Sequence, residues 1–256
     1  MTTDRPNGSL YTKVENGVAT VLFGTPASNA FSLELLNRLA AALNALSNDD
    51  AVQVVLLKSE GQKAFCAGAS FDELLQVDTQ EQAETFFGGF AQVINAMRQC
   101  RKIIVGRVQG KAVGGGVGLI AACDHVYAVE AASIRLSELS IGIAPLVIAP
   151  ALIRKMGTAA VAQLSFDPTQ WKNAYWGQEH GLYARVFENS REMDKELEFY
   201  LEKLAGYHPA ALLEWKKVLW ENTDHWDTLL RERAKITGGL ALSEFTKKAL
   251  NKFKNS

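Results

Sequence analysis

The sequence predicts an α/β fold that gives way, after about residue 145, to a mainly helical region. Three patterns support this prediction. Runs of β-branched residues alternate with segments of helical spacing, two loops of small residues each precede a helix, and strand signals nearly vanish from Leu146 onward. Alternating strands and helices are typical of a sheet that helices cover.

The first predicted element is a β-hairpin. Residues 10–15 and 18–23 are strand-like, and the Asn16-Gly17 pair between them permits positive φ at both turn centres. Ser32 is then placed to cap a helix over 33–46, where leucine and alanine recur at helical spacing.

The middle of the chain repeats the order strand, loop and helix. A buried strand over 52–58 leads into a loop of small residues at 61–74. The next helix is expected over 79–101, with Gly88-Gly89 as a candidate break, and a strand at 102–108 follows it.

The remaining elements are shorter. A buried helix over 117–123 ends at Asp124, which we expect to hold loop structure, and strands follow at 126–129 and 133–136. Further helices are expected at 149–156, 159–166, 173–180, 191–205, 209–221 and from 226 onward.

Composition argues against several classes of function. The 256 residues carry a formal net charge of -1, which provides no basic field for nucleic acid. The longest apolar run, 141–153, is too short to span a membrane, and the start lacks the apolar core of a signal peptide. Cys66, Cys100 and Cys123 are widely spaced, so neither a disulfide framework nor a metal site is expected. We therefore expect an unexported, cytoplasmic protein that binds no nucleic acid, membrane or metal.

The glycine triplet Gly114-Gly115-Gly116 lies between the predicted strand at 102–108 and the predicted helix at 117–123. The first amides of a helix lack partners within it, so they can bind an oxyanion or a phosphate. The spacing matches neither the dinucleotide fingerprint nor the phosphate loop of nucleotide-binding proteins. From the residues alone, the glycines also suit close packing of a helix against a sheet.

Five segments, in this order and spacing, resemble the crotonase superfamily, the enoyl-CoA hydratases and isomerases, over nearly the whole chain. They are 26–31, with its early proline; 64–71, similar to the Phe-x-Ala-Gly-Ala-Asp loop; 108–119, similar to the glycine signature; 136–145, similar to the segment with the catalytic glutamate; and 174–186.

The resemblance implies a crotonase-like spiral of ββα units followed by a C-terminal helical region. It implies a core over residues 1–195, with the spiral part to about 145, and an extension over 196–256 for oligomerisation and active-site cover. It also implies an acyl-CoA thioester as substrate, in fatty acid metabolism. Coenzyme A belongs to that substrate, no separate cofactor is expected, and the assembly would be a homotrimer or a hexamer.

The family chemistry implies roles for three residues. The backbone amides of Ala69 and Gly115 would hold the thioester oxygen as negative charge builds on it. Glu138 would be the base that removes a proton from the carbon next to the thioester. Read without the resemblance, Glu138 is more simply an exposed loop residue or a helix N-terminal cap.

Further residues would line the groove for coenzyme A by the same resemblance. These substrate-binding residues are Ser28, Ala67, Gly68, Ala69, Ser70, Phe71, Gly115 and Lys216. Lys216 matches a family lysine near the CoA phosphates, although a solvated helix lysine explains it as well.

Gly118 departs from the pattern of the hydratases, which usually carry a second glutamate at this position. Addition of water needs an oriented water molecule, whereas moving a double bond needs one carboxylate to take a proton and return it elsewhere. The single Glu138 therefore favours an enoyl-CoA isomerase. Three alternatives remain: an enoyl-CoA hydratase (a lyase), a relative that decarboxylates or dehydrates, and a protein that binds acyl-CoA without turnover. The glycine would also suit a pocket enlarged for a branched or aromatic acyl group.

Overall fold

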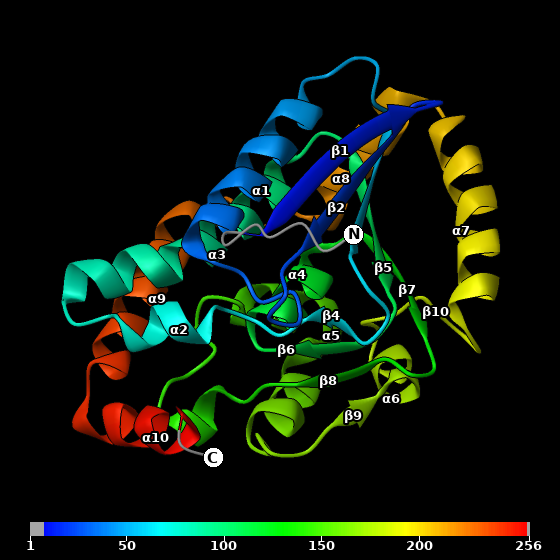
Figure 1. Ribbon diagram of the computed structural model, residues 1–256. Coiled ribbons are helices and arrows are strands. Elements are labelled where there is room, and N and C mark those ends of the chain that lie inside the picture. The colour runs from blue at the N-terminus through cyan, green and yellow to red at the C-terminus, as the bar shows by residue number, and fades with distance from the viewer. Residues whose placement is uncertain (1–7, 255–256) are drawn as a thin grey trace.

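The computed structural model describes residues 8–254 and has the predicted α/β architecture, with two sheets and helices around them (Figure 1). The larger sheet has six strands in the order β1-β2-β3-β5-β7-β10, and the smaller has four in the order β4-β6-β8-β9. The strands are β1 (Ser9–Glu15), β2 (Val18–Gly24), β3 (Val54–Ser59), β4 (Ala64–Cys66), β5 (Ile103–Val108), β6 (Lys111–Val113), β7 (His125–Val129), β8 (Ser133–Arg135), β9 (Lys172–Asn173) and β10 (Arg185–Phe187).

The larger sheet begins with the predicted hairpin. β1 and β2 pair antiparallel, and both turn residues have positive φ, 50° at Asn16 and 78° at Gly17. From β2 to β10 every neighbouring pair is parallel. Because parallel strands need helical crossovers that cover the sheet, β5 is buried along its whole length.

The helices are α1 (Leu33–Ser47), α2 (Phe71–Leu75), α3 (Gln80–Gln99), α4 (Gly115–Ala122), α5 (Ala149–Ser165), α6 (Ala174–Glu179), α7 (Ser190–Ala205), α8 (Pro209–Leu219), α9 (Trp226–Ala241) and α10 (Glu244–Lys254), with a short 3-10 helix η1 (Glu138–Ile141). None of the helices between residues 8 and 254 combines the length and the apolar character that crossing a membrane requires.

Helix α1 begins as predicted, because the Ser32 hydroxyl accepts a hydrogen bond from the Leu35 N–H at 3.1 Å. The expected break in α3 is wrong, since this helix continues through Gly88 and Gly89. A Cβ at Gly89 would lie 2.9 Å from Leu36 Cδ1 of α1. The glycine therefore allows α1 and α3 to approach closely and does not interrupt the helix.

Two strands lie in the region expected to be helical. β9 pairs antiparallel with β8, and β10 pairs parallel with β7. They have two and three residues, too short for an alternating pattern to be visible in the sequence. The helices predicted at 149–156 and 159–166 are confirmed as the two parts of α5, which Gly157 separates with a φ of 77°.

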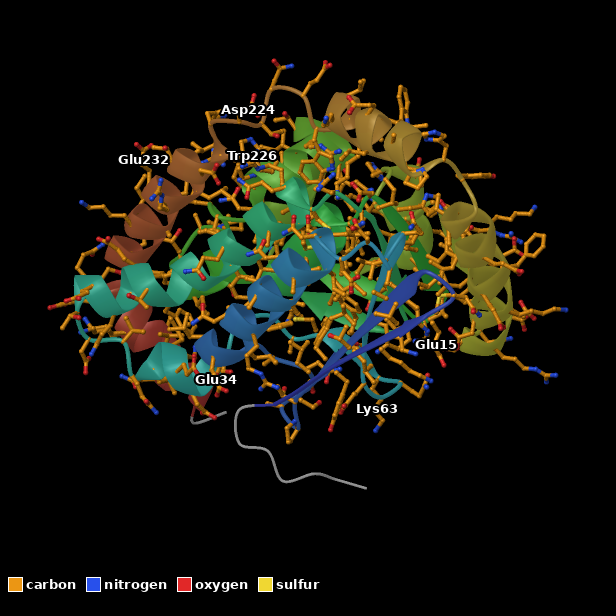
Figure 2. All side chains as sticks on the ribbon, turned by 90° about the horizontal axis from the view of Figure 1, so that it is seen from above. Glu15, Glu34, Lys63, Asp224, Trp226 and Glu232 are labelled. Carbon is orange, nitrogen blue, oxygen red and sulfur yellow. The ribbon has the colours of Figure 1, made fainter. Side chains whose placement is uncertain are left out.

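The C-terminal helices pack onto the rest of the molecule (Figure 1). α9 packs along α3, and α10 packs against η1. The boundary expected between residues 195 and 196 falls inside α7, a continuous helix. Figure 2 shows Trp226 at the start of α9, where its ring contacts Trp220 edge to face with 5.8 Å between centroids. In the same view Glu15, Lys63 and Glu232 lie at the outside, and all three are exposed.

Candidate active site

The two loops of small residues meet at one edge of the smaller sheet. β4 and β6 are neighbouring parallel strands, so the loops that follow them leave from the same edge. Gly68 has a φ of 91°, and a Cβ on it would lie 3.0 Å from the Val113 oxygen and 3.7 Å from the Gly115 nitrogen. Only a residue without a side chain allows the two backbones to approach this closely.

Two backbone N–H groups at this meeting point have no hydrogen-bond acceptor in the described part of the chain. Phe31 pairs with the residues on either side of Ala69: its N–H donates to the Gly68 oxygen at 2.8 Å, and its oxygen accepts from the Ser70 N–H at 2.7 Å. The Ala69 N–H is thereby left free. Gly115 is the first residue of α4, where no preceding turn offers an acceptor. Both groups suit an oxygen atom that carries negative charge.

Each glycine of the triplet accommodates a different neighbour. A Cβ at Gly114, which has a φ of 52°, would lie 2.7 Å from Glu138 Oε1. A Cβ at Gly115 would collide with the Phe90 ring, and one at Gly116 would lie 2.6 Å from the Cys66 oxygen. Close packing thus explains Gly116, while Gly114 and Gly115 allow the carboxylate and an aromatic ring to approach the α4 N-terminus.

A cavity of about 190 Å³ opens beside these loops, and most of its wall is apolar. It is lined by Ala67, Gly68, Ala69, Phe71, Leu74, Phe86, Phe87, Phe90, Val113, Gly114, Gly115, Ser137, Glu138, Ile141, Ile143, Ala144, Pro145, Leu146, Val147, Ile148 and Thr237. Both free amides and Glu138 therefore border one cavity. Apolar side chains from α3 and from the segment before α5 were not predicted as site residues, because in the sequence they resemble any other core residue.

Glu138 is the first residue of η1, and Leu136 and Ser137 separate it from the end of β8. Its backbone oxygen accepts a hydrogen bond from the Ile143 N–H at 3.1 Å, and Gly142 ends the short helix with a φ of 85°. Its Oε2 atom is buried and has no hydrogen-bond partner among the described residues. Burial raises the pKa of the Glu138 carboxyl to about 7. The carboxylate is therefore neither an exposed loop group nor a helix cap.

Replacing Glu138 with Gln should stabilise the fold at pH 8 by up to about 3 kcal/mol and leave it unchanged at pH 4. The carboxyl has a pKa of about 7 in the folded protein instead of 4.5. A group whose pKa rises on folding stabilises the folded state at pH values below its pKa in the unfolded chain. This contribution is lost as the pH rises through the group's pKa in the folded protein. Urea unfolding at both pH values measures the change.

Glu179, an exposed residue at the end of α6, provides the matched control. Glu179→Gln should change the free energy of unfolding by no more than about 0.5 kcal/mol at either pH. If Glu138→Gln raised the free energy of unfolding by the same amount at pH 4 and at pH 8, the buried charge would not be the cause of the increase.

The Gly118 position does not enlarge the cavity, so the expectation of a pocket there is wrong. The three atoms nearest to a Cβ on Gly118 all belong to Ile148, which would collide with it. Ile148 is buried and lines the cavity, whereas Gly118 does not. A glutamate at this position would need the isoleucine to move.

Among the predicted groove residues, Ser28 and Ser70 do not line the cavity. The Ser28 oxygen accepts the Ala67 N–H at 3.1 Å, and the Ser70 hydroxyl accepts the Glu73 N–H at 3.3 Å as the cap of α2. These two serines hold the backbone of the first loop in place.

The expected contact between Lys216 and the CoA phosphates does not fit the structure, and Lys216 is not a solvated lysine either. Its side chain is buried, and Nζ lies 2.9 Å from Asp124 Oδ2, 3.1 Å from the Met97 oxygen and 2.9 Å from the Lys102 oxygen. An ammonium held by three acceptors inside the protein is unavailable to a surface phosphate. Asp124 holds structure as predicted, since it also accepts hydrogen bonds from Trp220 Nε1 and the Ile104 N–H.

The fold and the cavity together define a class of enzyme in which two free amides and one buried carboxylate oxygen border the same apolar pocket. The sequence profile of the enoyl-CoA hydratase/isomerase family matches residues 13–253, and the chain belongs to this family. The family implies an acyl-CoA substrate.

This chain is similar both to proteins named as isomerases and to proteins named as hydratases. The peroxisomal Delta(3,5)-Delta(2,4)-dienoyl-CoA isomerase of Arabidopsis thaliana is 30% identical over 203 residues, which cover 75% of this chain and 72% of the relative. A Bacillus subtilis protein named "probable enoyl-CoA hydratase" is 28% identical over 244 residues, 94% of this chain and 93% of the relative.

Solved structures confirm the crotonase fold. The crystal structure of enoyl-CoA hydratase from Bacillus halodurans superposes with a TM-score of 0.89 at 20% identity, over 95% of this chain and 99% of that chain. The predicted crotonase fold with C-terminal helices is therefore correct.

Proposed function

We propose that this protein is an enoyl-CoA isomerase, which moves a double bond from position 3 to position 2 of an acyl-CoA thioester. One observation carries the proposal. Glu138 is the single carboxylate among the cavity-lining residues of the described chain, and Ile148 fills the space beside Gly118. One acid–base group is sufficient for a double-bond shift.

The amides and the carboxylate have separate roles in this reaction. The Ala69 and Gly115 N–H groups donate hydrogen bonds to the thioester oxygen, and each such donor contributes about 3 to 4 kcal/mol in acyl-transfer enzymes. Glu138 takes a proton from C2, and the electron pair delocalises through the C3–C4 double bond as a dienolate. The protonated Glu138 then delivers the proton to C4, so the double bond lies between C2 and C3. A carboxyl with a pKa of about 7 suits both transfers at neutral pH.

Hydration is the second candidate, because hydratase names are frequent among the relatives. Adding water to a 2-enoyl-CoA needs a water molecule held against C3 and a group that manages its proton. The apolar cavity wall and the side chain of Ile148 argue against such a water site. Binding without turnover is the third reading, and the same experiment distinguishes it.

The test is mass spectrometry and chromatography of 3-hexenoyl-CoA and crotonyl-CoA after incubation in heavy water with the protein. We expect 2-hexenoyl-CoA, deuterium at the α or γ carbon, and no added mass of water. Water addition to crotonyl-CoA would support the hydratase. Tight binding without deuterium exchange in either compound would support a protein that binds acyl-CoA without turnover.

We also propose self-association as a homotrimer or hexamer. Large apolar side chains are exposed on α8, at Trp215 and Val218, and near the end of the chain, at Ile236 of α9 and Phe245 of α10. Such surfaces are typical of subunit contacts. The cytoplasmic location remains a prediction from the sequence.

A further inference from the structure

We infer that Ile148 is a specificity-determining residue, which restricts the pocket to acyl groups without a branch at C3. This inference rests on the proposed function only for the position of the thioester oxygen, at the Ala69 and Gly115 N–H groups. The groups that carry it are Ile148, Gly118 and the cavity that Ile148 shares with Gly115 and Glu138.

Ile148 forms a rigid part of the cavity wall. Its side chain is 3% exposed, and its backbone oxygen accepts the Leu152 N–H at 3.1 Å in the first turn of α5. One residue later, the Ala149 N–H donates to the Pro145 oxygen at 3.0 Å. A β-branched side chain has little freedom at χ1, and its Cγ2 and Cβ atoms are the nearest atoms to a Cβ placed on Gly118. The restricted χ1 and the helical backbone hold the side chain in the cavity wall.

The wall stands at a definite place along the acyl chain. Gly115 carries the proposed donor to the thioester oxygen, and Gly118 follows three residues later on the same face of α4. The rise between them is about 4.5 Å, the span of a few carbon–carbon bonds. With the acyl chain directed from the Gly115 N–H along α4, the orientation that this inference assigns, Ile148 meets the carbons just beyond C2. A methyl branch at C3 would collide with it, whereas a straight chain passes along it.

The test measures binding of two saturated thioesters that cannot isomerise, butanoyl-CoA and 3-methylbutanoyl-CoA, by titration calorimetry. We expect the native protein to bind the straight chain at least about tenfold more tightly, the smallest effect typical of one unaccommodated methylene. Ile148→Ala should remove most of this preference. Ile148→Val, which keeps the branched side chain and perturbs folding less, should reduce the preference in the same direction.

Val161→Ala is the matched control, since Val161 is a buried β-branched residue of α5 that does not line the cavity. It should leave the preference unchanged. Equal affinities of the native protein for both thioesters, or an equal change in Val161→Ala, would overturn the inference. Because neither thioester reacts, a preference controlled by Ile148 would support the inference even if 3-hexenoyl-CoA were not isomerised, and that second result would count against the proposed function alone.

Discussion

Glu138→Gln should reduce kcat for the double-bond shift by about 10³- to 10⁴-fold, the upper range for loss of a general acid–base group. Glutamine has nearly the same shape but neither accepts nor returns a proton at C2 and C4. No other carboxylate lines the cavity in the described chain, so no neighbour replaces it. The affinity for a saturated acyl-CoA should stay within a few-fold of the native value, because the amide donors of Ala69 and Gly115 are unchanged.

The pH dependence gives an independent measurement of the same group. The base must be deprotonated in the free enzyme, and the pKa of the buried carboxyl is about 7. In the native protein kcat/KM should therefore rise about tenfold per pH unit below 7 and level off above it. Glu179→Gln should show the native profile. Residual activity of Glu138→Gln above a tenth of native, or a flat profile between pH 5 and 6, would contradict the assignment.

Lys216→Met should lower the free energy of unfolding by about 3 to 5 kcal/mol, the usual result of removing one partner of a buried ion pair. The change leaves the Asp124 carboxylate inside the protein without the ammonium 2.9 Å from it. It also leaves the Met97 and Lys102 oxygens without the donor that satisfies them. Urea unfolding at pH 7 measures the loss.

The adjacent Lys217 provides a control on the same helix. Its ion pair with Glu214 is exposed, with 61% and 67% of the two side chains accessible to solvent, so Lys217→Met should cost no more than about 1 kcal/mol. Adding Asp124→Asn to Lys216→Met should recover part of the loss because the unpaired charge is removed. If the two lysine variants were equally stable, the buried pair would not contribute as we describe.

The features predicted from the sequence were those with a strong local signal. Asn16-Gly17 specifies its turn through backbone conformation, and Ser32 specifies a helix start through one side-chain oxygen. The order of the small-residue loops was visible for the same reason, because glycine marks places where the backbone must come close to another group.

The features that the sequence did not predict depend on contacts between distant segments. β9 and β10 are strands only because β8 and β7 offer them partners. The sequence alone does not identify Ile148 as a site residue, because its position next to Gly118 is visible only in the folded structure. Lys216 resembled a solvated lysine because nothing near it in the sequence reveals that Asp124 lies against its ammonium.

The contact between α10 and Gly142 makes the order of synthesis important for this protein. A Cβ at Gly142 would lie 2.6 Å from Thr246 Oγ1, and Thr237 of α9 belongs to the cavity wall. A ribosome-bound chain that has emerged only as far as α8 already contains Ala69, Gly115 and Glu138. Its pocket would nevertheless lack Thr237, and the turn at Gly142 would lack its contact with α10. The nascent chain therefore carries all three of these proposed site residues before the cavity is complete.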